Sequence, residues 1–178
     1  MTSNITLIAG LLAIALFVSA IGTFTAVTKS TGLLTQGTAN ATVLEATDIT
    51  LVVSSIDFGN IGIGEIKSTE SGYAPFNVQN DGSVDINVTV NSTTLWATNP
   101  STTAYYRVKC RISQVACGIG SQETYIDMPV NTAATKVIGT LPFLDSGDDN
   151  FVDVQITVPL KESVGAKSAT VTFIATKA

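Results

Sequence analysis

Apolar and polar positions divide the chain into a hydrophobic N-terminal segment and a polar remainder. The first 28 residues carry no charged side chain, and residues 5–27 form a mostly apolar run that ends before Lys29. A helix over this run would extend about 35 Å, enough to cross the hydrocarbon core of a bilayer. A weaker three- to four-residue spacing of apolar positions continues to Leu44. The pattern predicts one long helix over residues 1–47, although Gly32 and Gly37 also fit a flexible linker after residue 28.

Beyond residue 48 apolar positions alternate with polar ones, which is the period of a β-strand. The clearest case is the stretch 84–90, and turn signals such as Asn80-Asp81-Gly82 separate the alternating stretches. The predicted strands, of which the fifth and sixth are weaker, cover residues 49–58, 75–80, 84–90, 105–112, 125–130, 135–141, 152–158 and 169–175. They indicate an antiparallel, immunoglobulin-like β-sandwich. The predicted fold class is α+β, with a helix over residues 1–47 and a sandwich head domain over residues 48–178.

The composition argues against catalysis and against nucleic-acid binding. Charged residues make up 13% of the chain, the formal net charge is −5, and histidine is absent. An acidic chain without clusters of Lys and Arg is a poor ligand for phosphate backbones. Without histidine the commonest general base is missing, and the glycines at 59, 62 and 64 lack the spacing of a phosphate-binding loop. We therefore expect neither an enzyme nor a nucleic-acid-binding protein, and no cofactor other than calcium.

The two cysteines, Cys110 and Cys117, are seven positions apart. In a cytosolic protein they would be free thiols, whereas in an exported protein they would form a disulfide that closes a short loop. This spacing is too long for a Cys-x-x-Cys redox site. We predict a disulfide with a structural role.

Two further groups of polar residues are candidate sites. The loop 145–150 is a candidate calcium site, because three carboxylates surround a glycine that permits a sharp turn: Asp145, Asp148 and Asp149. The simpler interpretation of this loop is a solvated turn between two strands. Asn-x-Ser/Thr sequons predict glycosylation at Asn40, Asn87 and Asn91, of which the last two lie on the polar face of a predicted strand.

Three interpretations of the hydrophobic N-terminal segment compete. A secretory signal would end at the small residues 18–20, but the first four residues lack the positive charge of such a signal. A simple membrane anchor would place Lys29 on the inner side, which conflicts with sequons and a disulfide outside the cell. The third interpretation is a mature chain from which a charged leader peptide has been cleaved. Its hydrophobic segment would then pack against copies of itself in a polymer.

The third interpretation agrees with a resemblance to a known family. The uncharged run 5–27, followed by the Ser/Thr/Gly/Gln-rich stretch 28–42, resembles the N-terminal helix of archaellins and archaeal type IV pilins. Bacterial pilins carry a glutamate at mature position five, where this chain has Ile5. The stretches 55–60, 80–89 and 158–172 resemble β-sandwich domains of archaeal surface proteins.

The resemblance implies the structural subunit of an extracellular archaeal filament, a type IV pilus or an archaellum, that serves adhesion or motility. The chain would rest in the membrane before assembly, would need an assembly platform, and would then polymerise with itself. The polymerisation helix would use apolar side chains of the filament core: Leu7, Leu11, Ile14, Phe17, Ile21 and Phe24. The alternative is a secreted or membrane-anchored β-sandwich surface protein. This alternative includes matrix fibres that polymerise by donor-strand exchange, in which an N-terminal strand joins a neighbour's sheet.

Overall fold

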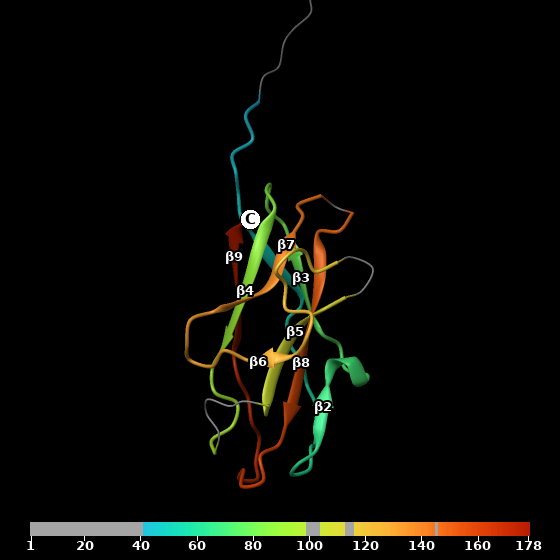
Figure 1. The fold of residues 1–178 in the computed structure, drawn as a ribbon, viewed down its shortest axis with the longest axis vertical. Helices are drawn as coiled ribbons and strands as arrows, with labels where there is room; N and C mark the ends of the chain where they lie inside the picture. Colours follow the sequence, from blue (N-terminus) through green and yellow to red (C-terminus); the bar gives the residue numbers. More distant parts are fainter. Residues whose placement is uncertain (1–40, 99–103, 113–115, 145) are drawn as a thin grey trace, which may run out of the picture. The chain divides into compact units, whose positions relative to one another are not determined.

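The structure is a computed structural model that describes residues 41–98, 104–112, 116–144 and 146–178. The chain divides into two units, Met1–Thr42 and Val43–Ala178, and the second unit contains every described strand. The described part of this unit has one 3-10 turn, η1 (Thr69–Ser71), and the following strands (Figure 1): β1 (Ile49–Val53), β2 (Ile66–Ser68), β3 (Phe76–Asn80), β4 (Ile86–Ser92), β5 (Tyr106–Arg111), β6 (Ile126–Asp127), β7 (Thr135–Leu141), β8 (Asp149–Thr157) and β9 (Val171–Lys177).

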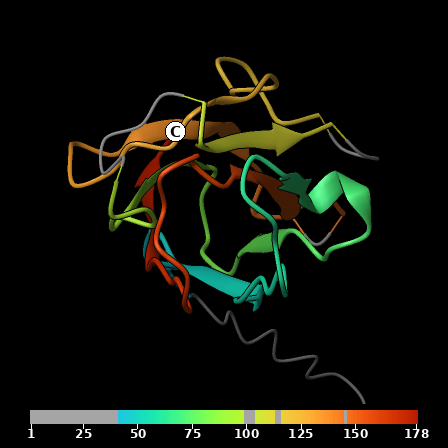
Figure 2. The ribbon, with the colours of Figure 1, turned by 90° about the horizontal axis from the view of Figure 1, so that it is seen from below.

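The strands form the two antiparallel sheets of a β-sandwich. The first sheet has the order β1-β3-β8-β5-β6, with β2 beside the C-terminal part of β8, and the second has the order β7-β4-β9. In the second sheet Val88 of β4 pairs with Ile138 of β7 on one side and with Ala175 of β9 on the other. Seen from one end, β1 and β9 lie at one lateral side of the sandwich, and β5 and β7 lie at the other (Figure 2).

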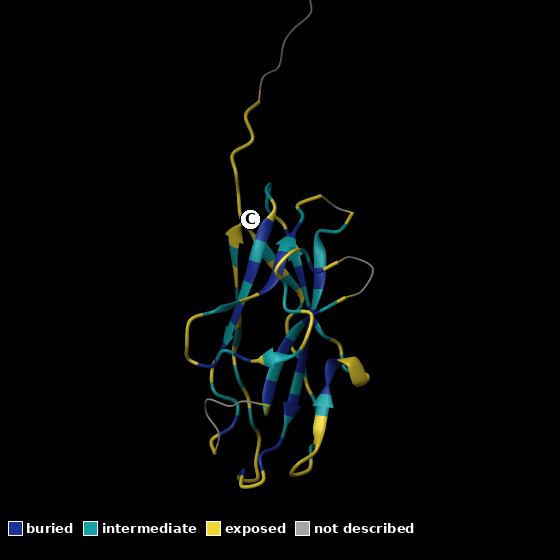
Figure 3. Ribbon diagram, in the orientation of Figure 1, coloured by how far each residue is buried: buried dark blue, intermediate teal, exposed yellow. Residues whose placement is uncertain are grey.

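Alternation along the strands places one face of each sheet in the core. In β4, Ile86, Val88 and Val90 have no solvent exposure, whereas the residues between them are half-buried (Figure 3). This is the pattern of an antiparallel sheet with one solvated face. Trp96 fills the core from the loop after β4, and its indole Nε1–H donates to the carbonyl oxygen of Tyr105 at 3.0 Å.

The predicted fold class of α+β is wrong for the described residues. These residues are all-β apart from the single turn η1, and none of them belongs to a helix long and apolar enough to cross a membrane. The predicted helix extended to residue 47, yet residues 41–48 contain no helix and β1 begins at Ile49. The rest of that prediction falls on residues 1–40, which lie outside the described residues.

Hydrogen bonds to Ser83 explain why residues 44–46 are not helical. The Ser83 hydroxyl donates to the carbonyl oxygen of Leu44 and accepts from the N–H of Ala46, while the N–H of Ser83 donates to the carbonyl oxygen of Ala46 at 2.9 Å. A helix would use these same backbone groups for its own i to i−4 bonds. The β-branched residues Thr42 and Val43 also disfavour a helix. Tertiary hydrogen bonds therefore override the weak helical spacing.

Candidate functional site

A disulfide lies at one lateral side of the sandwich. Cys110 of β5 is bonded to Cys117, with the two Cα atoms 6.1 Å apart, and both residues are fully buried. The structure thus contains the disulfide that the sequence predicts. The chain after Cys117 returns to β5, where the N–H of Cys110 donates to the carbonyl oxygen of Gln122 at 2.7 Å.

The segment 117–122 also covers the outer edge of β7. The N–H of Gly139 donates to the carbonyl oxygen of Cys117, and the N–H of Gln122 donates to the carbonyl oxygen of Val137, each at 3.1 Å. The two backbones approach so closely that a Cβ atom on Gly139 would clash with the carbonyl oxygen of Ile119. This segment therefore joins β5 of one sheet to β7 of the other, and we call this side of the sandwich the stapled side.

The opposite lateral side, between β1 and β9, is open. The N–H of Thr93 donates to the carbonyl oxygen of Thr170, and the N–H of Ala178 donates to that of Asp85, in the register of the β4–β9 ladder. Hydrogen-bonded and non-hydrogen-bonded pairs alternate in an antiparallel ladder. It follows that alternate residues of β9, among them Val171, Phe173 and Ala175, direct their N–H and C=O groups away from β4, to an edge that has no strand partner among the described residues.

The chain next to each of these two strands also lacks backbone partners. Residues 54–61, which follow β1, and residues 163–169, which precede β9, make no backbone–backbone hydrogen bond with any described residue. β1 pairs only with β3, and β9 pairs only with β4, within the described part of the chain. We call β1, β9 and these two segments together the open side.

Interior side chains along the open side are only partly buried. Val137 and Ile138 on the stapled side have no solvent exposure. By contrast, the following interior residues of the open side are partly exposed although they pack on the core: Ile49, Leu51, Ile56, Phe58, Ile61, Ala169, Val171, Phe173 and Ala175. The sandwich is thus sealed on one side and incompletely covered on the other.

A groove of about 1090 Å³ runs between residues 54–61 and 162–171. Its floor consists of core side chains that keep a few per cent of exposure, among them Phe76, Trp96 and Tyr106. At its end near β9, the rings of Phe76 and Phe173 meet edge to face with centroids 5.3 Å apart. This open groove combines an apolar floor with walls whose backbone makes no backbone–backbone hydrogen bond with a described residue, although Lys67 donates to the carbonyl oxygens of Phe58 and Asn60. An apolar floor beside such walls resembles the environment that an added β-strand requires.

Glu162 fixes one wall of the open groove. Its carboxylate accepts hydrogen bonds from the hydroxyl and the N–H of Thr98, at 2.6 and 3.0 Å, and it pairs with Lys167 Nζ at 2.5 Å. The hydrogen bonds with Lys167 and Thr98 lower the pKa of Glu162 to about 2. The loop that leads into β9 is therefore tied to the loop that carries Trp96.

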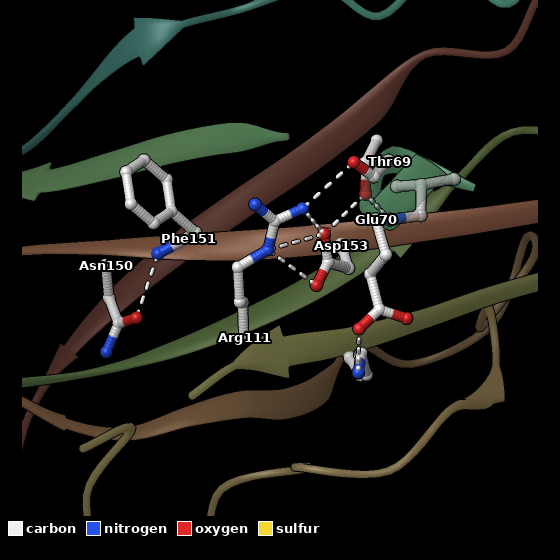
Figure 4. Close-up of polar contacts among 8 residues, drawn as sticks. Thr69, Glu70, Arg111, Asn150, Phe151 and Asp153 are labelled. Atoms are coloured by element: carbon white, nitrogen blue, oxygen red, sulfur yellow. Dashed lines mark hydrogen bonds and ion pairs between the residues drawn. The ribbon is translucent and has the colours of Figure 1, made fainter. Parts of the chain in front are cut away.

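A buried ion pair fastens η1 to the outer face of the first sheet (Figure 4). Asp153 of β8 has no solvent exposure and accepts hydrogen bonds from Arg111 of β5 and from the hydroxyl of Thr69. Arg111 also donates to the carbonyl oxygen of Thr69 at 3.0 Å. The hydrogen bonds with Asp153 raise the pKa of Arg111. Every partner belongs to the same sheet and turn, so this cluster is structural.

The candidate calcium loop divides its carboxylates between neighbours on β3. Gln79 donates to Asp148 at 3.1 Å, and Asn77 donates to Asp149 at 3.3 Å. Asp145 lies outside the described residues. Among the described residues no three His, Cys, Asp or Glu side chains gather into a metal-binding group. Calcium binding by this loop stays a prediction.

Two predicted glycosylation sites lie on the solvated face of β4. Asn87 and Asn91 are half-buried and project from the central strand of the second sheet. Asn87 accepts a hydrogen bond from Lys136 of β7 and donates one to the carbonyl oxygen of Lys177 of β9. Asn40 lies outside the described residues, as do all six apolar residues of the predicted polymerisation helix.

Reasoning from the sequence missed the open side. The alternation over residues 49–58 predicts a strand, but it does not show that residues 54–58 have no partner. A comparison of the chain with protein-family models, curated proteins and solved structures found no match. The geometry of the sandwich is therefore the basis for the function proposed below.

Proposed function

We propose that this chain is the structural subunit of an extracellular surface filament. The observation that carries the proposal is the open side, where a free strand edge borders a groove floored by core residues. A free edge beside an apolar groove is a template for pairing with another chain. A domain that is sealed on one side and open on the other is suited to joining with copies of itself.

The free edge of β9 offers considerable binding energy. Three N–H and three C=O groups face outward from Val171, Phe173 and Ala175, and each hydrogen bond contributes about 1 kcal/mol net, or roughly 6 kcal/mol together. Covering the half-buried apolar side chains adds to this sum at about 25 cal/mol per Å² of apolar surface. When each copy uses one surface to contact the copy before it and a different surface to contact the copy after it, the assembly does not close into a ring or dimer, and a filament results.

Several properties of the sequence support a location outside the cell. The disulfide is typical of oxidising compartments, and the surface is rich in Ser, Thr and Asn but poor in charge. The uncharged first 28 residues would hold the subunit in the membrane before assembly. The resemblance to archaeal pilins and archaellins favours a filament for adhesion or motility, with itself and an assembly platform as partners.

The alternative is a single β-sandwich surface protein, secreted or anchored, whose open side has no partner copy. Production of the full chain in an exporting host that also supplies an assembly platform, followed by electron microscopy of sheared surface material, separates the two proposals. We expect filaments whose protein content is this chain, and none from the same host without its gene. Material that remains monomeric at high concentration, with no filaments, would contradict the filament proposal.

A further inference from the structure

One loop on the stapled side holds a large apolar side chain in solvent. Ile119 lies between Gly118 and Gly120, whose φ angles of 83° and 81° belong to the left-handed region that favours glycine. The carbonyl oxygen of Ile119 lies against Gly139 of β7, whereas its side chain is 94% exposed. We call residues 118–120 the protruding loop. The chain around this loop projects from the sandwich on the side opposite β1 (Figure 2).

The protruding loop is anchored at both of its ends. The disulfide fixes Cys117, the residue before it. Ser121, the residue after it, donates its N–H to the carbonyl oxygen of Gly118 at 3.3 Å, and its hydroxyl accepts from the N–H of Gly139 at 2.6 Å. A loop that is already fixed loses little conformational freedom when it binds a partner. The fold therefore presents Ile119 to solvent in a preorganised position.

The open groove, on the opposite lateral side, offers a matching apolar surface. Its floor consists of core residues, and Val164 at its rim is 97% exposed. Six apolar side chains that line the groove are at least partly exposed: Ile56, Phe58, Ile63, Val164, Ala169 and Val171. An exposed apolar patch that continues into a groove marks an interaction site.

The charges beside the protruding loop and beside the open groove have opposite signs. Glu123 lines the same shallow hollow as Ile119, and Lys161 directly precedes Glu162 at the wall of the groove. Glu123 and Lys161 are both exposed, and neither forms an ion pair within the described part of the chain. A contact between the loop of one copy and the groove of another would bring these two charges together, which favours that pairing of surfaces.

We propose that the protruding loop of one copy inserts Ile119 into the open groove of a neighbouring copy, beside Val164. This inference rests on the proposed function and specifies how the subunits join. The stapled side of one copy would then face the open side of the next, which includes the free edge of β9. Because the two surfaces lie on opposite lateral sides, a domain cannot fill its own groove (Figure 2). Each added copy brings a new loop and a new groove, so growth continues.

The yield of filaments from full-length variants tests this contact in the host that supplies an assembly platform. Ile119→Asp would place a charge in an apolar groove, so we expect the yield to fall about tenfold or more. Ile119→Val removes a single methylene and should keep most of the yield. Leu144→Asp, in the exposed loop between β7 and β8, is the matched control and should leave the yield unchanged.

Both substituted positions are exposed, so these variants should keep the melting temperature of the parent. A loss of filaments with Ile119→Asp but not with Leu144→Asp supports the inference. Equal yields from these two variants would contradict it.

Cysteine cross-linking identifies the surfaces that meet. A chain with Ile119→Cys and Val164→Cys carries two exposed thiols, while the native cysteines are buried and already bonded. After oxidation of assembled material we expect a covalent ladder of dimers, trimers and longer species on non-reducing denaturing gels. Ile63→Cys or Ser168→Cys in place of Val164→Cys locates the loop along the groove. The control pairs Ile119→Cys with Leu144→Cys and gives no ladder.

Each outcome of the cross-linking decides the inference. A ladder from the groove positions but not from the control supports it. Dimers from Ile119→Cys alone would show that two protruding loops meet each other, and would overturn it. Filaments without a cross-link at any of the three groove positions would also overturn it, but would leave the proposed function standing. A parent chain that forms no filaments fails the proposed function itself.

Discussion

Removal of the disulfide should weaken the stapled side by a predictable amount. In the chain-entropy model, closing a loop of the size spanned by Cys110 and Cys117 restricts the unfolded chain by about 2.5 kcal/mol. In a domain of this size that corresponds to a fall in melting temperature of about 9 °C. Because both residues are fully buried, the double variant Cys110→Ala and Cys117→Ala also loses some packing, so this figure is a lower bound.

Thermal unfolding of the oxidised protein and of the double variant, followed by near-ultraviolet circular dichroism, measures this difference. Reductant should lower the melting temperature of the parent towards that of the variant and should not affect the variant. A fall of less than about 2 °C in both cases would refute the reasoning, because the disulfide would then contribute little to closing this side.

Three further predictions concern stability. Asp153→Ala should cost about 3 kcal/mol in urea unfolding, because Arg111 loses its buried partner, and replacing both residues by apolar ones of similar size should recover most of the loss. Gly139→Ala should cost about 2 kcal/mol by the same measurement, because the new methyl group meets the carbonyl oxygen of Ile119; a neutral effect would mean that the staple segment can move aside. The pKa of Glu162 is lowered to about 2 in the folded protein, so its ionised carboxylate stabilises the fold at a pH above the ordinary carboxyl pKa. This contribution is lost as the pH falls from about 4.5 towards 2, and Glu162→Gln should flatten the dependence of melting temperature on pH in that window.

Much of the sandwich was predictable from alternation alone. The stretches 75–80, 135–141 and 84–90 fall on β3, β7 and β4 to within two residues at either end. β2 was missed because three residues are too few to show a period of two. The burial of Asp153 was also hidden, because alternation places it on a solvated face, and only the distant turn η1 and Arg111 cover it.

The open side depends on information that local patterns do not contain. Whether a strand such as β9 has a second neighbour is set by the order of strands in the sheets, which involves residues far apart in the sequence. The spacing of Cys110 and Cys117 indicated a disulfide, but not that the segment behind it would pair with β7 and seal one side. The helix predicted from the spacing up to Leu44 is wrong at residues 44–46 for the same reason, because these residues are held by hydrogen bonds to Ser83, almost forty residues away.

Hydrogen exchange at the free edge of β9 tests the central claim most directly. We predict that the amides of Val171, Phe173 and Ala175 exchange rapidly in dispersed protein and become protected in assembled filaments. The amides of Gln122 and Gly139 on the stapled side should be protected in both states, because each already donates a hydrogen bond within the domain. Free-edge amides of β9 that exchange equally fast before and after assembly would show that the open side is not where copies of this chain join.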